Sequence, residues 1–209
     1  MVTFMDRKQE VVLTEGNNLM AYQGTYLLAD IFKTRSYLKE VALVLGASVI
    51  IGLSAPLAVP LPFTPVPIVV QSHVVLLMSL FLGSRLAPLA VLALIAQCAI
   101  GLPVLSQGKF GMAALMGPTA GYVFGWVLAS YLTGSLIEKA KHQPTKTKVF
   151  SALAIGNAAI YLLGLPWLAV FVGIKYTLFL GLIPFLVGDV LKILFSIKAL
   201  ELARFFKKG

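Results

Sequence analysis

Residues 149–172 read VFSALAIGNAAIYLLGLPWLAVFV, an apolar run without a single charged side chain. A helix rises about 1.5 Å per residue, so a run of this length can cross the roughly 30 Å hydrocarbon core of a bilayer. Comparable apolar runs, separated by proline, glycine or charged residues, follow one another from about residue 38 onward. The pattern predicts an all-α integral membrane protein.

The apolar runs predict a six-transmembrane-helix bundle in residues 39–209. The expected spans are Leu38–Ala58, Ile68–Leu82, Leu86–Ile100, Pro118–Ile137, Val149–Val172 and Pro184–Phe206. Gly83-Ser84-Arg85 is expected to form a tight turn between the second and third spans. Residues 1–38 contain four acidic residues and no unbroken apolar stretch of signal-peptide length. We therefore interpret them as a cytoplasmic N-terminal extension.

The composition supports a membrane location. Hydrophobic residues make up 59% of the chain and charged residues 12%, against about 45–50% and about 25% in an ordinary soluble domain. The net charge of +9 would suggest nucleic acid as a partner of a soluble protein, but the basic residues lie mostly in short segments between apolar runs. We therefore expect the lipid bilayer, and no nucleic acid, as the partner of these charges.

The distribution of basic residues predicts the orientation. Thirteen of the 17 Lys and Arg residues fall on the side of the two termini, and only Lys109 and Lys175 fall in loops on the other side. Cytoplasmic loops carry the excess of Lys and Arg in multispan proteins. The sequence therefore predicts a multi-pass protein of the cell's inner or plasma membrane with both termini cytoplasmic.

The loops expected on the outer side, residues 59–67, 101–117 and 173–183, are apolar and rich in proline and glycine. Irregular backbone within a membrane protein is tolerated where it is buried in protein or lines a cavity. We expect these loops to fold back over the bundle and cap a ligand pocket. The alternative is that they are extended connectors.

Asp189 and Lys192 are the strongest site candidates. They lie three residues apart in the last predicted span, and residues at this spacing share one face of a helix. An intramembrane charge costs at least about 2.5–3.5 kcal/mol on insertion scales, and pairing rarely makes it favourable relative to an apolar replacement. The pair therefore indicates a ligand site, with a structural clamp between helices as the alternative.

Other polar residues of the spans are weaker candidates. Gln71 is expected at the level of Asp189, and Gln97 could contact a ligand or bridge helices. His73 and Asn157 are expected to form interhelical hydrogen bonds. The chain has one cysteine, Cys98, and no pattern of metal ligands, so no metal site is predicted.

Enzyme signatures are missing from the sequence. It contains no GxSxG, HExxH or GxxxxGK[ST] pattern, so we predict no catalytic residues and no ATP hydrolysis by the chain itself. Transport against a gradient would then need energy from a partner or an ion.

Several separate blocks of the chain resemble the BioY family. They are Pro60-Leu-Pro-Phe-Thr-Pro-Val-Pro-Ile68 with Gln71, Gly101-Leu-Pro103, Gly117-Pro-Thr-Ala-Gly-Tyr122, and Pro184-Phe-Leu-Val-Gly-Asp-Val-Leu-Lys192. Their order and spacing are similar to the family from about residue 40 to the C-terminus. The resemblance implies the biotin-binding S component of an energy-coupling factor transporter, with a transmembrane T component and two ATPase subunits as partners.

The resemblance also implies which residues contact biotin, which is then the transported ligand and not a cofactor. Asp189 and Lys192 correspond to the family's ligand-contacting Asp and Lys. Gln71 is a further candidate because it is expected at the same depth in the membrane as Asp189. The apolar parts of biotin suit Phe63, Tyr122, Trp126 and Trp167. Lys109 is the outer cation best placed for the carboxylate, and the alternative is that it reaches the ureido end. The alternative functions are a self-sufficient biotin facilitator acting as a homo-oligomer, an intramembrane enzyme using Asp189, and a scaffold.

Overall fold

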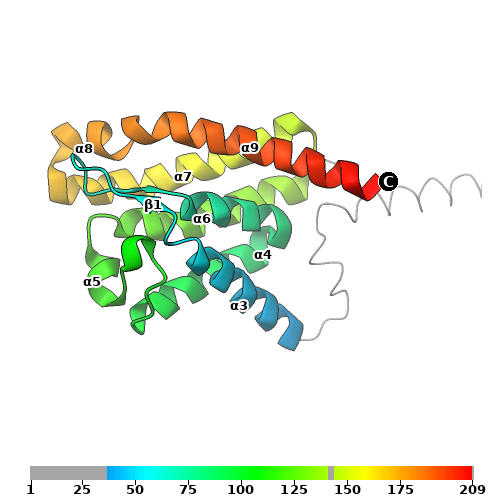
Figure 1. The fold of residues 1–209 in the computed structure, drawn as a ribbon, viewed down its shortest axis with the longest axis horizontal. Coiled ribbons are helices and arrows are strands. Elements are labelled where there is room, and N and C mark those ends of the chain that lie inside the picture. Colours follow the sequence, from blue (N-terminus) through cyan, green and yellow to red (C-terminus); the bar gives the residue numbers. More distant parts are fainter. Residues whose placement is uncertain (1–36, 141–143, 209) are drawn as a thin grey trace, which may run out of the picture.

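The computed structural model describes residues 37–140 and 144–208 of the chain, and it is predominantly helical (Figure 1). The long helices are α3 (Tyr37–Leu53), α4 (Gln71–Ala99), α6 (Ala120–Lys139), α7 (Lys146–Val172) and α9 (Ile183–Lys208). The short elements are β1 (Ala58–Val59), β2 (Ile68–Val69), η1 (Ser106–Gly108), α5 (Gly111–Met116) and α8 (Ile174–Gly181). The predicted extension, residues 1–38, lies outside the described part of the chain except for its last two residues, which begin α3.

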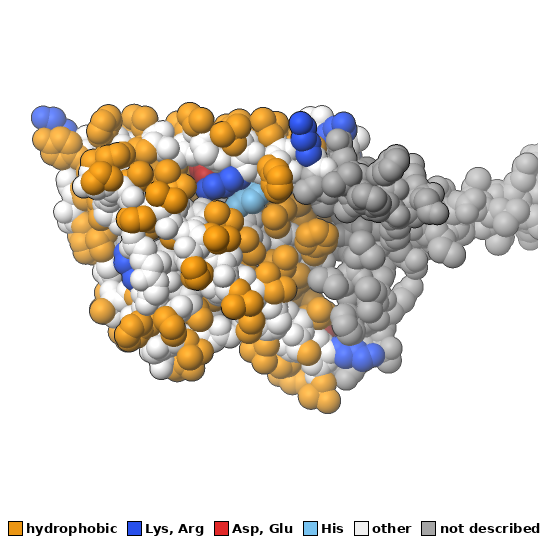
Figure 2. All heavy atoms as spheres, viewed as in Figure 1, with side chains coloured by type: hydrophobic (Ala, Val, Ile, Leu, Met, Phe, Trp, Pro, Cys, Tyr) orange, Lys and Arg blue, Asp and Glu red, His pale blue; other side chains and the backbone are white. Residues whose placement is uncertain are grey.

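Four helical segments of the described part are long and apolar enough to cross a membrane. They are Gln71–Ala99, Ala120–Lys139, Lys146–Val172 and Ile174–Lys198. Large hydrophobic side chains also cover much of the surface (Figure 2), for example Leu191 and Phe195 on α9, which are exposed. An exposed apolar surface of this kind is compatible with lipid and not with water. The prediction of a multi-pass helical membrane protein is confirmed at this level.

Helix α4 contains two of the predicted spans and bends sharply between them (Figure 1). Gly83 interrupts the helix with φ 76° and ψ −173°, a conformation that residues with a side chain rarely adopt. Both oxygens of the Glu138 carboxylate, at the end of α6, accept hydrogen bonds from Ser84, at 2.7 Å from the backbone nitrogen and 2.6 Å from the hydroxyl. The carboxylate thus satisfies a backbone N–H at the start of the second half of α4.

The structure differs from the predicted spans and loops at several places. Ile68 and Val69 lie in β2 and the helix of the second predicted span begins at Gln71, and the predicted loop 101–117 contains the short helix α5. Helix α3 ends at Leu53 rather than at Ala58, because Pro56 disfavours a helical conformation at Ala55; residues 54–57 form turns instead. The segment 173–183, predicted as a loop, contains the eight-residue helix α8. Gly173 at φ 79° separates α8 from α7, so the chain reverses without an extended connector.

The core lies where α6 packs between α4 and α7. Strands β1 and β2 pair antiparallel, Ala58 with Val69 and Val59 with Ile68, and close the proline-rich segment 60–67 into a hairpin loop. The Thr64 hydroxyl in this loop donates to the carbonyl oxygen of Leu180 on α8 at 2.7 Å. The hairpin loop therefore folds back onto the bundle, as the sequence predicted for this segment.

Candidate ligand-binding site

A cavity lies between the β2 strand, the 105–109 segment and helices α6, α7 and α9. It is lined by Val66, Pro67, Val69, Ser72, Leu105, Ser106, Lys109, Thr119, Tyr122, Val123, Trp126, Asn157, Ile160, Tyr161, Phe185, Asp189 and Lys192. The cavity volume is about 60 Å³, which is several times what one water molecule requires. Two of the predicted capping loops, 59–67 and 101–117, contribute to the wall.

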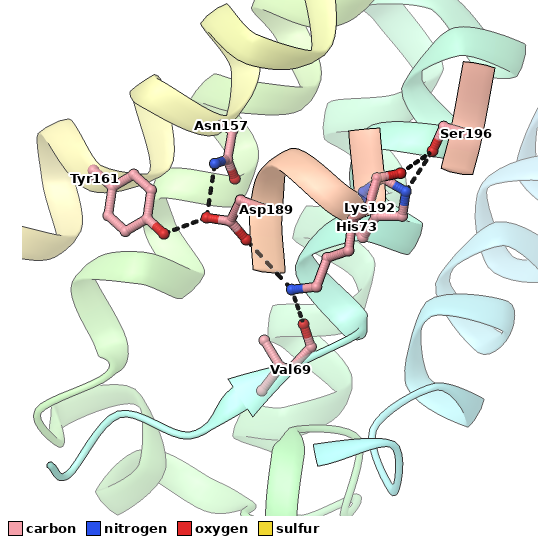
Figure 3. A network of polar contacts seen from close by, with 7 residues as sticks. All are labelled: Val69, His73, Asn157, Tyr161, Asp189, Lys192 and Ser196. Atoms are coloured by element: carbon pink, nitrogen blue, oxygen red, sulfur yellow. Dashed lines mark hydrogen bonds and ion pairs between the residues drawn. The ribbon is translucent and has the colours of Figure 1, made fainter. Parts of the chain in front are cut away.

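Asp189 and Lys192 lie together on one face of α9 and both line the cavity (Figure 3). The Lys192 Nζ is 3.4 Å from Asp189 Oδ1 and donates a second hydrogen bond, at 2.8 Å, to the Val69 carbonyl oxygen on β2. Asp189 is buried and Lys192 is half-buried. The predicted carboxylate–ammonium pair is therefore present, turned into a cavity and not toward a neighbouring helix alone.

Two residues of α7 hold the other oxygen of the carboxylate. Asn157 Nδ2 donates to Asp189 Oδ2 at 2.9 Å, and the Tyr161 hydroxyl donates to the same oxygen. Asn157 and Tyr161 are four residues apart and share one face of α7. Among the described residues, Oδ1 has only the long contact with Lys192, so this oxygen can still accept from a ligand.

A further polar link connects α4 to α9 just beyond the cavity. His73 Nε2 contacts the Ser196 hydroxyl, which in turn donates to the Lys192 carbonyl oxygen at 2.9 Å. Figure 2 shows a histidine, a basic and an acidic side chain close together on a surface that is otherwise mostly hydrophobic.

Tyr122 and Trp126 on α6 form an aromatic part of the wall. The Tyr122 hydroxyl donates to the Gly181 carbonyl oxygen at 3.0 Å, and its ring meets that of Tyr161 edge-on, with centroids 6.2 Å apart. The ring also lies against Gly164, where an added Cβ would come within 2.5 Å of it. These contacts fix the Tyr122 ring against the apolar side of the cavity.

Three predicted site residues do not line the cavity. Gln71 is fully buried, and its amide nitrogen donates to the carbonyl oxygens of Ile51 at 3.1 Å and Val104 at 2.7 Å. Trp167 is 37% exposed and donates to the Gly117 carbonyl oxygen at 2.9 Å. Phe63 is 53% exposed in the hairpin loop. Gln71 and Trp167 anchor the 101–117 segment to the bundle, while Lys109, Tyr122 and Trp126 line the cavity as expected.

The polar residues of the other helices also have defined places. His73 and Asn157 form interhelical hydrogen bonds, as predicted, and Asn157 in addition lines the cavity. Gln97 Nε2 donates to the Ser48 hydroxyl at 2.9 Å and so bridges α4 and α3. Tyr161 was missed from the sequence, although its spacing of four residues from Asn157 in an apolar helix could have singled out both.

The fold and the cavity define a helical membrane protein with a cavity between its helices, lined by one carboxylate–ammonium pair and an aromatic wall. The sequence model described as the BioY family matches residues 23–208. The chain belongs to this family, and the match begins within the segment predicted as an extension.

The named relatives are transporters. The chain is 36% identical over 155 residues to "Biotin transporter BioY" of Rhizobium etli, covering 71% of this chain and 83% of the relative. It is 36% identical over 162 residues to the protein of the same name from Rhodobacter capsulatus, covering 69% and 85%. A "Probable biotin transporter BioY" of Pyrococcus horikoshii is 33% identical, with 74% and 89% covered.

A solved structure has the same fold. It is the crystal structure of "the S-component for biotin from an ECF-type ABC transporter", with a TM-score of 0.71 and 28% sequence identity. The alignment covers 82% of this chain and 93% of that one. Since the family and its named relatives are transporters, the prediction that the chain is not an enzyme is confirmed.

Proposed function

We propose that this protein binds biotin from the outer side of the membrane, as the substrate-specific S component of an energy-coupling factor transporter. The named relatives are biotin transporters, and the structural neighbour is an S component for biotin. For this chain, the proposal rests on the carboxylate–ammonium pair in the cavity, whose hydrogen-bonding capacity is only partly used within the described residues.

Asp189 and Lys192 have free hydrogen-bonding capacity that matches a cyclic urea. The ureido ring of biotin has N–H donors and one carbonyl acceptor. Asp189 Oδ1 can accept from an N–H, and the Lys192 ammonium has three hydrogens but only two partners among the described residues. Leaving such a ring buried without partners would cost about 1–3 kcal/mol per group. The pair therefore provides the acceptor and donor that the ring needs.

The wall around this pair suits the remainder of the ligand. Tyr122, Trp126 and Phe185 are buried along the cavity, and aromatic surfaces of this kind bury the apolar thioether ring and the hydrocarbon chain favourably. No resident cofactor is required, because biotin is the transported substrate. Gln71 and Trp167 could act on the ligand only indirectly, through the 101–117 segment that they anchor, and Phe63 only through the hairpin loop that contains it.

We propose that the chain crosses the membrane six times with both termini cytoplasmic. The two halves of α4, on either side of Gly83, then serve as separate spans, and α3 is the first. Thirteen of the 17 basic residues lie on the terminal side in this topology, in agreement with the excess expected on the cytoplasmic side. The site between Lys109 and Asp189 then lies toward the outer face of the plasma membrane.

The energy for uptake is proposed to come from a T component and two ATPase subunits, because the sequence contains no nucleotide-binding GxxxxGK[ST] pattern. The alternative is a self-sufficient facilitator that works as a homo-oligomer. Measuring biotin uptake by the chain alone and by the chain together with the coupling subunits distinguishes the two. Biotin accumulation against a gradient only in the presence of T and ATPase subunits supports the proposal, whereas accumulation or facilitated entry by the chain alone supports the alternative.

Biotin binding itself is tested by titrating the detergent-purified chain with biotin and dethiobiotin. Saturable binding of biotin at one site per chain is expected. Dethiobiotin is the second ligand because it has the same ureido ring. Absence of saturable binding to a folded sample rules out the proposed function.

A further inference from the structure

The indole nitrogen of Trp126 is a buried donor without a partner. Trp126 is 4% exposed on α6, and its Nε1 has no hydrogen-bond partner within residues 37–140 and 144–208. In those ranges, the other buried side-chain nitrogen or oxygen of this kind is Oε1 of Gln71, which does not line the cavity. Trp126 does line it. Buried polar atoms are nearly always paired, because an unpaired one costs free energy, so this N–H requires an explanation.

The other aromatic residues of the wall leave no such donor. The Tyr122 hydroxyl donates to the Gly181 carbonyl oxygen, and the Tyr161 hydroxyl donates to Asp189. Phenylalanine would supply apolar surface at position 126 without burying a donor, as Phe185 does elsewhere on the wall. Among the described aromatic residues of the wall, the indole N–H is therefore the donor that remains for a ligand.

The packing of α6 against α7 places Trp126 at the level of the carboxylate–ammonium pair. A Cβ added at Gly125 would lie 2.9 Å from the Ile160 carbonyl oxygen, so the two helices touch there. Trp126 directly follows Gly125 and lies within one helical turn of this level. The two α7 residues that hold the Asp189 carboxylate lie three residues before Ile160 and one residue after it. Trp126 and Asp189 therefore line the same end of the cavity.

The ligand proposed for this site has a matching acceptor at that end. The carbonyl oxygen of a cyclic urea has two lone pairs and can accept two hydrogen bonds. The Lys192 ammonium, which has one hydrogen left beyond its two partners, can donate to one of them. The second lone pair is then available to a neutral donor at the same level.

We infer that the Trp126 N–H donates to the ureido carbonyl oxygen beside Lys192, which makes this protein selective for a ring with a strong acceptor at that position. The inference rests on the proposed function, since it assigns the ring end of the ligand to Asp189 and Lys192. The face of the indole remains apolar and still packs against the hydrocarbon part of the ligand. Trp126 then contributes apolar surface through its face and specificity through its nitrogen.

Trp126→Phe tests the inference, because it keeps an aromatic ring and removes the donor. The ligands are biotin and thiobiotin, in which sulfur, a weaker acceptor, replaces the ureido oxygen while both N–H groups remain. The full-length purified wild type is expected to bind biotin more tightly than thiobiotin. Trp126→Phe should weaken biotin about threefold to tenfold, the range for one neutral hydrogen bond, and weaken thiobiotin less. Trp167→Phe is the matched control, because it makes the same change outside the cavity; it leaves the ratio of the two affinities unchanged.

A second measurement observes the indole directly. The chain has two tryptophans, so Trp167→Phe leaves Trp126 as the sole source of an indole N–H signal in the nuclear magnetic resonance spectrum. Biotin is expected to shift this proton downfield and to slow its exchange with water, because the proton enters a new hydrogen bond. Trp126 is intact in this sample, so the measurement tests the inference even if Trp126→Phe does not fold.

Three results would overturn the inference. Equal weakening of biotin and thiobiotin by Trp126→Phe, or an indole signal that biotin does not shift, assigns Trp126 a packing role and leaves the proposed function intact. Weakening of biotin but not of dethiobiotin, which lacks the thioether sulfur, assigns the N–H to that sulfur instead. Failure of the wild type to bind biotin overturns the inference and the proposed function together.

Discussion

The Tyr161 hydroxyl donates to Oδ2 of Asp189, and this contact across α7 and α9 leaves Oδ1 as the oxygen available to a ligand (Figure 3). Asn157 adds a second hydrogen bond to the same oxygen. A carboxylate that is held through Oδ2, and whose Oδ1 has only the 3.4 Å contact with Lys192, cannot turn away from the cavity. The arrangement fixes in advance the direction from which a ligand N–H must approach, which lowers the entropy cost of binding.

Tyr161→Phe is therefore predicted to weaken biotin binding by about tenfold, because one charge-assisted hydrogen bond to Asp189 is lost while the ring is kept. Isothermal titration of the purified variant measures the change. Tyr131→Phe is the control, since Tyr131 is 52% exposed on α6 and does not line the cavity. Unchanged affinity in Tyr161→Phe would show that Asn157 alone is sufficient to hold the carboxylate.

Substitution of Asp189 and Lys192 should affect ligand binding and stability differently. Asp189→Asn keeps the shape of the side chain but removes the charge and places an amide N–H₂ beside donors, so we predict at least a hundredfold loss of biotin affinity, about 3 kcal/mol. Lys192→Met leaves the buried carboxylate without its cation and is predicted also to lower the thermal unfolding temperature.

The double variant Asp189→Asn with Lys192→Met separates these effects. It removes both charges, so it should recover much of the stability lost in Lys192→Met while still failing to bind biotin. A double variant that binds biotin as well as the wild type contradicts the assigned role of the pair.

The sequence predicted the most informative part of this site because charge is rare in an apolar helix. Asp189 and Lys192 are three residues apart in a span that is otherwise largely apolar, so their spacing alone placed them on one face. The turn at Gly83 could be predicted for a similar reason, since glycine followed by serine and arginine interrupts an apolar run. Both features are local in the sequence.

The orientation of the aromatic and amide side chains could not be predicted in this way. In a membrane, apolar residues face lipid as well as the core, so the hydrophobic pattern does not identify the inner face of a helix. Tyr161 and Trp167 are six residues apart on α7, which places them about 120° apart around the helix. Tyr161 faces the cavity and Trp167 does not, and only the packing of α7 against α6 and α9 decides between them.

The sequence predicted that the loops fold back over the bundle, but not the contacts that fix their paths. Phe63 lies in a hairpin loop whose position depends on the hydrogen bond between Thr64 and Leu180, residues that are far apart in the chain. Gln71 is at the expected start of its helix, but its amide is used by the carbonyl oxygens of Ile51 and Val104. Long-range backbone contacts of this kind leave no pattern in a single sequence.

The hydrogen bond between His73 and Ser196 is predicted to stabilise the packing of α4 against α9. His73→Ala and Ser196→Ala should each lower the free energy of unfolding by about 1–2 kcal/mol, the cost of a buried hydrogen bond that loses one partner. Because the two side chains act on each other, the double variant should cost less than the sum of the single variants. Strict additivity in thermal or denaturant unfolding of the purified proteins would show that the contact does not contribute.

The bend in α4 gives a prediction about stability that does not depend on the ligand. Gly83 has a positive φ, and a Cβ added there would lie 2.3 Å from Glu138 Oε1. Gly83→Ala is therefore strained in two ways, by its backbone conformation and by displacement of the carboxylate from Ser84. We predict that it lowers the free energy of unfolding by about 1–3 kcal/mol.

Gly46→Ala is the matched control, because nothing lies within 4 Å of an added Cβ in α3, and alanine favours a helix by about 1 kcal/mol over glycine. Thermal unfolding in detergent should thus separate the two glycines in opposite directions. If Gly83→Ala unfolds at the same temperature as the wild type, the bend does not require this backbone conformation, and the assignment of the two halves of α4 to separate spans loses its structural basis.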